Sequence, residues 1–229
     1  MSEKTSLSTT RADIAAAAAR GISGAIPVAG GLVGEVVSAF IPNQKLERVA
    51  RFAELLAAQV EVVEAKQARF EARIHTPEGS DLLEQGIQQA ARAVSYDRQQ
   101  RIASIVATGL TEEQLRYDRT CKLLAILDSL NDSEILLLIF YSRTPTMGSP
   151  WHQEMMNRHP DLLRPASREV GAAAAERERG AIRDSYERTL LAQGLLDSTE
   201  TRLRLSALGQ MLLAYSGGTD SAESGALAP

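Results

Sequence analysis

The chain has 229 residues and a formal net charge of −4; 44% of its residues are hydrophobic, 24% charged and 4% aromatic. This length and composition support one domain or two small ones with buried cores. The balance of 25 Lys and Arg against 29 Asp and Glu argues against a protein that binds nucleic acid through a generally basic surface.

Cysteine usage and the first residues bear on the compartment of the protein. Cys121 is the only cysteine, so no internal disulfide can form, and no C-x-x-C pair is present to hold zinc. Residues 1–11 lack the basic and apolar regions of a secretory signal. We therefore expect a cytoplasmic protein, with association at the inner face of a membrane as the alternative.

Helix-forming residues dominate the sequence. Ala, Leu, Glu, Gln and Arg are abundant, and no long run of residues alternates between apolar and polar. The first helix is expected over residues 10–24, where five consecutive alanines favour a helix but offer little bulk to bury. The pattern predicts an all-α fold built as a helical bundle.

The apolar stretch Ile22–Ile41 is the most unusual feature of the sequence. Its length matches a bilayer span, and its glycines spaced four apart would let two helices approach closely. A proline, a double glycine and a carboxylate make a straight span unfavourable. Three interpretations stay open: a turn between two buried helices, a reversible membrane-inserting hairpin, and a surface for self- or partner association. The predicted contact residues are Pro27, Gly30, Gly31, Gly34 and Glu35.

A long helix is predicted from a cap at Asn43 to Ile74. Its apolar residues recur every three or four positions and form a heptad seam of more than four repeats, flanked by charges of both signs. Such a seam must face another helix, either in the same chain or in a second copy. The seam residues are Leu46, Val49, Ala53, Leu56, Val60, Val63, Phe70 and Ile74.

Four further helices are predicted before residue 143. The first is capped by Ser80 and buries apolar residues as far as Val94, and the second ends near Gly109. The third begins at a capping box over residues 111–114. The run Ile135–Phe140 is apolar on all sides and predicts a central buried helix.

Four prolines change the character of the chain between residues 143 and 165, which predicts a loop with one short helix over residues 151–158. A polar helix over residues 167–193 is expected next, with its apolar side chains inward: Val170, Ile182, Tyr186 and Leu190. The predicted organisation is a helical bundle over residues 1–142, a module over residues 143–216 that shares the helix 132–142, and a disordered tail over residues 217–229.

Motifs for catalysis, nucleotides and metals are lacking in the sequence. No phosphate-binding loop and no G-x-S-x-G nucleophile motif occurs, and Cys121 lies beside apolar residues without an activating base nearby. One group carries metal-capable side chains, but a proline ends any helix that could hold both of its histidines. Its members are His152, Glu154, His159 and Asp161. We predict no enzyme, no cofactor and no metal site.

From Asp132 to Tyr215 the order of elements resembles a winged-helix module. The resemblance rests on Gly194-Leu195-Leu196, a polar turn over residues 197–201, a short strand over residues 202–205, and a closing helix that begins at Ser206. It implies one short β-hairpin wing near the C-terminus. It also implies a helix in the DNA major groove with a wing on the phosphates, through Arg183, Arg188, Arg202 and Arg204.

The charges around this module favour contact with protein over DNA. Between residues 164 and 204, eight arginines face seven acids, and two of the acids, Asp184 and Glu187, lie on the supposed recognition helix. Nucleic-acid binding therefore stays possible but is not favoured.

The N-terminal half resembles helical bacterial proteins of unsettled role, through Ile26-Pro27-x-x-Gly30-Gly31 and the later Leu46-x-x-x-Ala50-Arg51-Phe52. This resemblance implies a non-enzymatic module in a bacterial stress or antiphage system. We predict a helical association protein that contacts itself, a protein partner or a membrane through the apolar stretch, as a homo-oligomer or with a partner. The alternative is a winged-helix transcription regulator that dimerises through the long helix.

Overall fold

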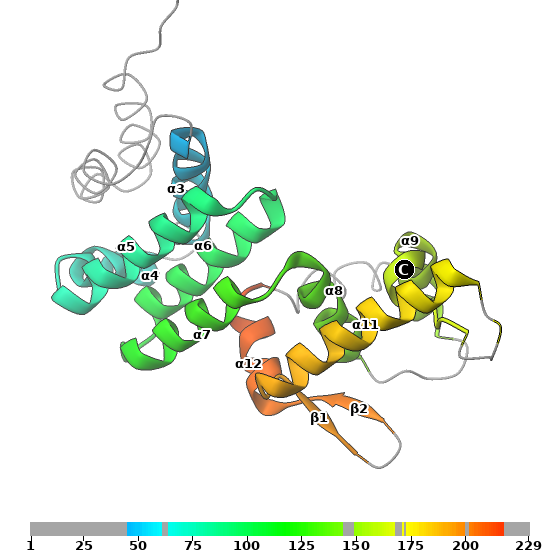
Figure 1. Ribbon diagram of the computed structural model, residues 1–229. Helices are drawn as coiled ribbons and strands as arrows, with labels where there is room; N and C mark the ends of the chain where they lie inside the picture. The colour runs from blue at the N-terminus through cyan, green and yellow to red at the C-terminus, as the bar shows by residue number, and fades with distance from the viewer. Residues whose placement is uncertain are drawn as a thin grey trace, which may run out of the picture. The chain divides into compact units, whose positions relative to one another are not determined.

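The computed structural model describes residues 45–60, 64–143, 149–167, 171, 173–199 and 202–217. These residues form ten α-helices and one two-stranded antiparallel hairpin (Figure 1), which confirms the predicted all-α fold with a short hairpin near the C-terminus. The predicted first helix, the apolar stretch Ile22–Ile41 with its five contact residues, and residues 218–229 of the predicted tail lie outside the described residues.

The described residues form two compact units. One comprises residues up to Ala125 together with Tyr215–Gly217, and the other comprises Ile126 to Ala214. The chain passes from the first unit to the second within one helix and returns to the first at Tyr215. In the described part of the chain, no helix is both long enough and apolar enough to cross a membrane.

The first unit is a bundle in which the predicted seam faces helices of the same chain. α3 and α4 both pack against α5 and α6, and α6 buries ten of its sixteen residues. The described seam side chains of α3 and α4 are buried in this bundle: Val49, Ala53, Leu56, Val60, Phe70 and Ile74. The bounds are α3 (Leu46–Val60), α4 (Glu64–Ile74), α5 (Pro77–Arg92), α6 (Tyr96–Thr111) and α7 (Tyr117–Ser129).

Helix ends in this unit differ from the predictions at three places. α5 begins at Pro77 and is capped by Thr76, whose hydroxyl accepts a hydrogen bond from the Gly79 amide, so the cap is not Ser80. Proline at the first helical position explains the earlier start, because its missing N–H would be unsatisfied there anyway. Val94 follows the end of α5 and is 79% exposed. Residues 111–114 form no capping box, because Thr111 is the buried last residue of α6.

The second unit is built around α8 (Asp132–Ser142), which packs against α10, α11 and the second strand of the hairpin. Asn131 and Glu134 cap α8 with a reciprocal capping box. One side of α8 is buried and the other is partly exposed, so it is less enclosed than its apolar sequence predicts. The other elements are α9 (Pro150–Arg158), α10 (Pro160–Leu163), α11 (Ala174–Ala192), β1 (Leu196–Ser198), β2 (Leu203–Leu205) and α12 (Ala207–Tyr215).

The hairpin is fastened to α12 by Ser206. The Ser206 hydroxyl donates a hydrogen bond to the Gly194 carbonyl at 2.6 Å and accepts one from the Gly209 amide at 3.0 Å. The backbone amide of Ser206 donates to the Leu195 carbonyl. Because one side chain caps α12 and also holds the turn before β1, the hairpin and the following helix are positioned together.

Candidate interaction surface on helix α11

Helix α11 is the most exposed long helix among those described. Leu190 is the only buried residue of its nineteen, whereas α6 buries ten of sixteen. Of the side chains predicted to face inward, Leu190 is buried and Tyr186 half-buried, but Ile182 is 46% exposed; Val170 lies outside the described residues. The inward prediction for Ile182 is wrong. α11 therefore presents most of its surface, including a large apolar side chain.

Polar contacts, rather than a wide apolar face, hold α11 on α8 and α10. Tyr141 of α8 donates its hydroxyl proton to a Glu187 carboxylate oxygen at 2.7 Å, and Arg183 Nε donates to the same oxygen at 3.0 Å. Arg183 Nη1 also donates to the Leu163 carbonyl at 2.8 Å. The Arg183 and Glu187 side chains are each only 18% exposed. We call the side chains of Tyr141, Arg183 and Glu187 the polar staple of the second unit.

The staple shifts the pKa values of two of its members. Burial raises the pKa of Tyr141 to about 12; the Arg183 bond opposes this shift and the Glu187 bond adds to it. Burial lowers the pKa of Arg183, but its bonds to Tyr141 and Glu187 outweigh burial and raise the pKa overall. At neutral pH Tyr141 is therefore a neutral phenol and Arg183 a charged guanidinium.

A second ion pair on α11 joins Arg179 to Glu176 at 3.5 Å, one turn apart on the same helix. Arg188 Nε donates to the backbone carbonyl of Asp184 at 3.1 Å. Pairs spaced three and four residues apart stabilise a helix that buries little. The positive charges of Arg179 and Arg183 are thus largely balanced within α11.

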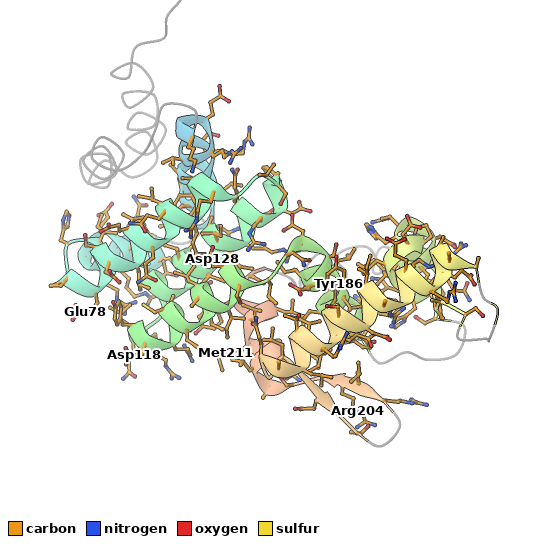
Figure 2. The ribbon with its side chains drawn as sticks, viewed as in Figure 1. Glu78, Asp118, Asp128, Tyr186, Arg204 and Met211 are labelled. Carbon is orange, nitrogen blue, oxygen red and sulfur yellow. The ribbon has the colours of Figure 1, made fainter. Side chains whose placement is uncertain are left out.

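A shallow groove of about 400 Å³ lies along one side of α11, between this helix and residues of α8 and α10. Its large apolar lining residues are Leu162, Ile182 and Tyr186. Tyr186 is labelled on α11 in Figure 2. Glu178, Ile182 and Tyr186 are spaced four residues apart and so follow one face of the helix. Such a stripe is visible in the sequence, but its exposure is not.

The four predicted nucleic-acid contacts are in different environments. Arg183 is held in the polar staple, whereas Arg188, Arg202 and Arg204 are exposed. Arg204 on β2 (Figure 2) pairs across the hairpin with Asp197 of β1, which places a carboxylate residue beside it. Exposed arginines near the hairpin are therefore interleaved with acids.

The two histidines of the predicted loop take part in side-chain packing and in helix capping. His152 is buried, and its ring nitrogens contact the Ser149 hydroxyl at 3.0 Å and the Arg143 carbonyl at 3.3 Å. Its ring also lies nearly perpendicular to the Phe140 and Trp151 rings, in T-shaped contacts. His159 lies between α9 and α10, where its backbone caps both helices. Within the described residues, no three His, Cys, Asp or Glu side chains gather as metal ligands would.

Three of the five tyrosines have raised pKa values in the folded chain, so we expect them to ionise at a higher pH than a free phenol. Tyr117, Tyr141 and Tyr215 donate hydrogen bonds to Asp81, Glu187 and Glu112. The bond to Asp81 raises the pKa of Tyr117, and burial together with the Glu112 bond raises that of Tyr215 to about 12. In denaturant all five tyrosines should titrate at about pH 10.

A spectrophotometric titration of tyrosinate absorbance checks this expectation. Raised pKa values favour the neutral phenols in the folded chain, so their contribution to stability is intact below about pH 10 and is lost as the pH rises toward 12. Simultaneous ionisation of all five tyrosines in the folded chain, without unfolding, would contradict the three hydrogen-bonded positions.

No family model, curated protein or solved structure matches this chain.

Proposed function

We propose that the chain is a non-enzymatic association protein whose helical units present surfaces for contact with a copy of itself, another protein or a membrane. Exposure of α11 is the observation that carries the proposal. This helix buries one residue of nineteen, and two of its arginines, Arg179 and Arg183, form ion pairs with carboxylates of the same helix. A helix that displays an apolar residue between balanced charges suits protein contact better than phosphate contact.

The apolar stretch Ile22–Ile41 is the other contact region in the proposal, through Pro27, Gly30, Gly31, Gly34 and Glu35. It lies outside the described residues, so its sequence alone supports this role. Burial of the heptad seam also bears on which surface is available for association. The described seam residues pack inside the first unit, so they do not offer a surface for dimerisation. Association through α11 or the apolar stretch fits this arrangement better.

DNA binding by the winged-helix-like module is the second candidate. The observation in its favour is a hairpin that carries Arg202 and Arg204 beside a long exposed helix with Arg188. Two features argue against DNA binding. Arg183 is engaged by Glu187 and the Leu163 carbonyl, and Asp197 lies opposite Arg204. A role in a bacterial stress or antiphage system belongs to the same proposal and rests on the sequence resemblance alone.

The mass of the full chain in solution tests the association proposal. Light scattering with and without detergent should give a mass above the 24.7 kDa of one chain. Gly30→Leu with Gly34→Leu should return the mass toward one chain, because bulky side chains prevent close helix contact. Ala58→Leu adds the same side chain at an exposed position of α3 and is the control.

Vesicle flotation and a duplex DNA probe complete the same experiment. Recovery with vesicles would assign the contact to a membrane. A monomeric mass in both buffers, together with full recovery in the aqueous fraction, would contradict association with a second copy and with a membrane. DNA binding that is lost on charge reversal of Arg202 and Arg204 would instead support the second candidate.

A further inference from the structure

The groove beside α11 has a charge pattern that the proposed function does not use. Asp161 of α10 and Glu178 of α11 both line it, both are exposed, and neither side chain has a hydrogen-bond or ion-pair partner among the described residues. The other charges of the lining are balanced, because Arg179 pairs with Glu176 and Arg183 with Glu187 outside the groove. Two negative charges therefore remain beside the groove.

The apolar part of the groove is lined by residues close in the chain to these acids: Leu162 follows Asp161, and Ile182 lies one turn after Glu178. Ile182 is 46% exposed and is one of three large hydrophobic side chains that are exposed among the described residues; the other two, Val94 and Tyr96, belong to the first unit. Leu162 and Tyr186 line the same groove and add to its apolar surface. A groove lined by apolar residues and unpaired acids matches a partner that carries apolar and basic residues together.

The shape of the groove favours a helix over a small molecule. A small ligand normally buries most of its surface in an enclosed pocket. Here Ile182 and both carboxylates face solvent, so the groove is a shallow trough that follows the axis of α11. Troughs of this kind receive the apolar side of an amphipathic helix, whose anchors repeat every three or four residues.

We infer that the groove formed by Asp161, Leu162, Glu178, Ile182 and Tyr186 docks a basic amphipathic helix of a partner protein. Its aliphatic anchors pack on Leu162, Ile182 and Tyr186, and its lysines or arginines pair with Asp161 and Glu178. The net charge of −4 draws such a partner toward the chain before contact. This inference rests on the proposed function, because it names the partner chemistry for one of its two contact regions.

Two synthetic helical peptides, used as probes with the full chain, test the inference. One has leucines every three and four positions flanked by lysines, and the other has glutamates in place of the lysines. Fluorescence anisotropy of the labelled peptides should show that the lysine peptide binds and the glutamate peptide does not. Added salt should weaken binding, because the pairing charges are exposed.

Variants assign the binding to the groove. Asp161→Lys with Glu178→Lys should weaken the lysine peptide at least about tenfold and let the glutamate peptide bind. Glu54→Lys with Glu113→Lys makes the same change in net charge at exposed positions of the first unit and should leave both affinities unchanged. Ile182→Ser should weaken the lysine peptide without reversing the charge preference. Far-UV circular dichroism confirms that each variant is folded.

Three results would overturn the inference: no binding of the lysine peptide, equal binding of both peptides, or equal effects of the two double charge reversals. Equal effects would mean that the peptide responds to the overall charge of the chain. Self-association and membrane contact, the other branches of the proposed function, have a separate readout: their failure would appear as a monomeric mass and no vesicle recovery, whatever the peptides do.

Discussion

Gly79→Ala is expected to destabilise the first unit by about 3 kcal/mol, the upper end of the cost of forcing an extra carbon into a packed site. A Cβ at residue 79 would lie 2.0 Å from the Arg73 carbonyl oxygen. That oxygen accepts hydrogen bonds from the Thr76 amide and hydroxyl. The Arg73 guanidinium reaches the carbonyls of Leu110 and Glu113. Because this corner holds three helices together, it has little freedom to move away.

The sign of the effect makes Gly79→Ala informative. In an open helix, alanine is more favourable than glycine by up to about 1 kcal/mol. Gly180→Ala in α11 is the control, since its Cβ would meet only the Ala166 Cβ at 3.3 Å. Urea unfolding followed by far-UV circular dichroism should show a clear loss for the first variant and a change within about 1 kcal/mol for the second. Equal midpoints would mean that the α4–α5 corner relaxes.

Sequence periodicity predicted the fold class because local signals determine it. The seam spacing identified six buried side chains of α3 and α4, from Val49 to Ile74, but missed Phe52 and Ala57, which are buried as well. The same spacing does not say which helix covers the seam, since a helix of another copy offers a similar surface. The structure resolves that choice by packing α3 and α4 against α5 and α6.

Helix ends were predicted less well than helices, for a specific reason. Several residues near each end can act as a cap, and tertiary contacts decide between them. Ser80 and Thr76 are both acceptable caps, but Pro77 cannot extend a preceding helix and is well suited to begin the next. Thr111 has the spacing of a capping box, yet it is buried at the end of α6.

The candidate site on α11 could be predicted only in part from the sequence. An apolar residue at helical spacing is normally assigned to the core, and this rule misplaced Ile182. Its exposure depends on how α8 and α10 meet α11, which involves the polar staple of Tyr141, Arg183 and Glu187. Such long-range polar contacts leave no periodic signal. The balanced arginines and acids of α11 were the available hint that this helix buries little.

Glu187→Ala is expected to lower the free energy of unfolding of the second unit by about 2–3 kcal/mol, since it leaves charged and phenolic groups without their acceptor. Arg183 would keep its bond to the Leu163 carbonyl but lose its carboxylate partner while only 18% exposed. Tyr141 would lose the acceptor of its hydroxyl proton, which lies 2.7 Å away. Glu187→Gln keeps an acceptor oxygen without the charge and should lose less.

Fluorescence of Trp151, the only tryptophan, reports unfolding of the second unit, to which it belongs. Glu178→Ala is the matched control, because Glu178 is an exposed glutamate of the same helix with no described partner, and its change should stay within about 0.5 kcal/mol. Similar losses for the two alanine variants would show that the staple does not hold α11. A selective loss for Glu187 would show that α11 is fastened by polar contacts on its inner side, which leaves the stripe through Ile182 available to a partner.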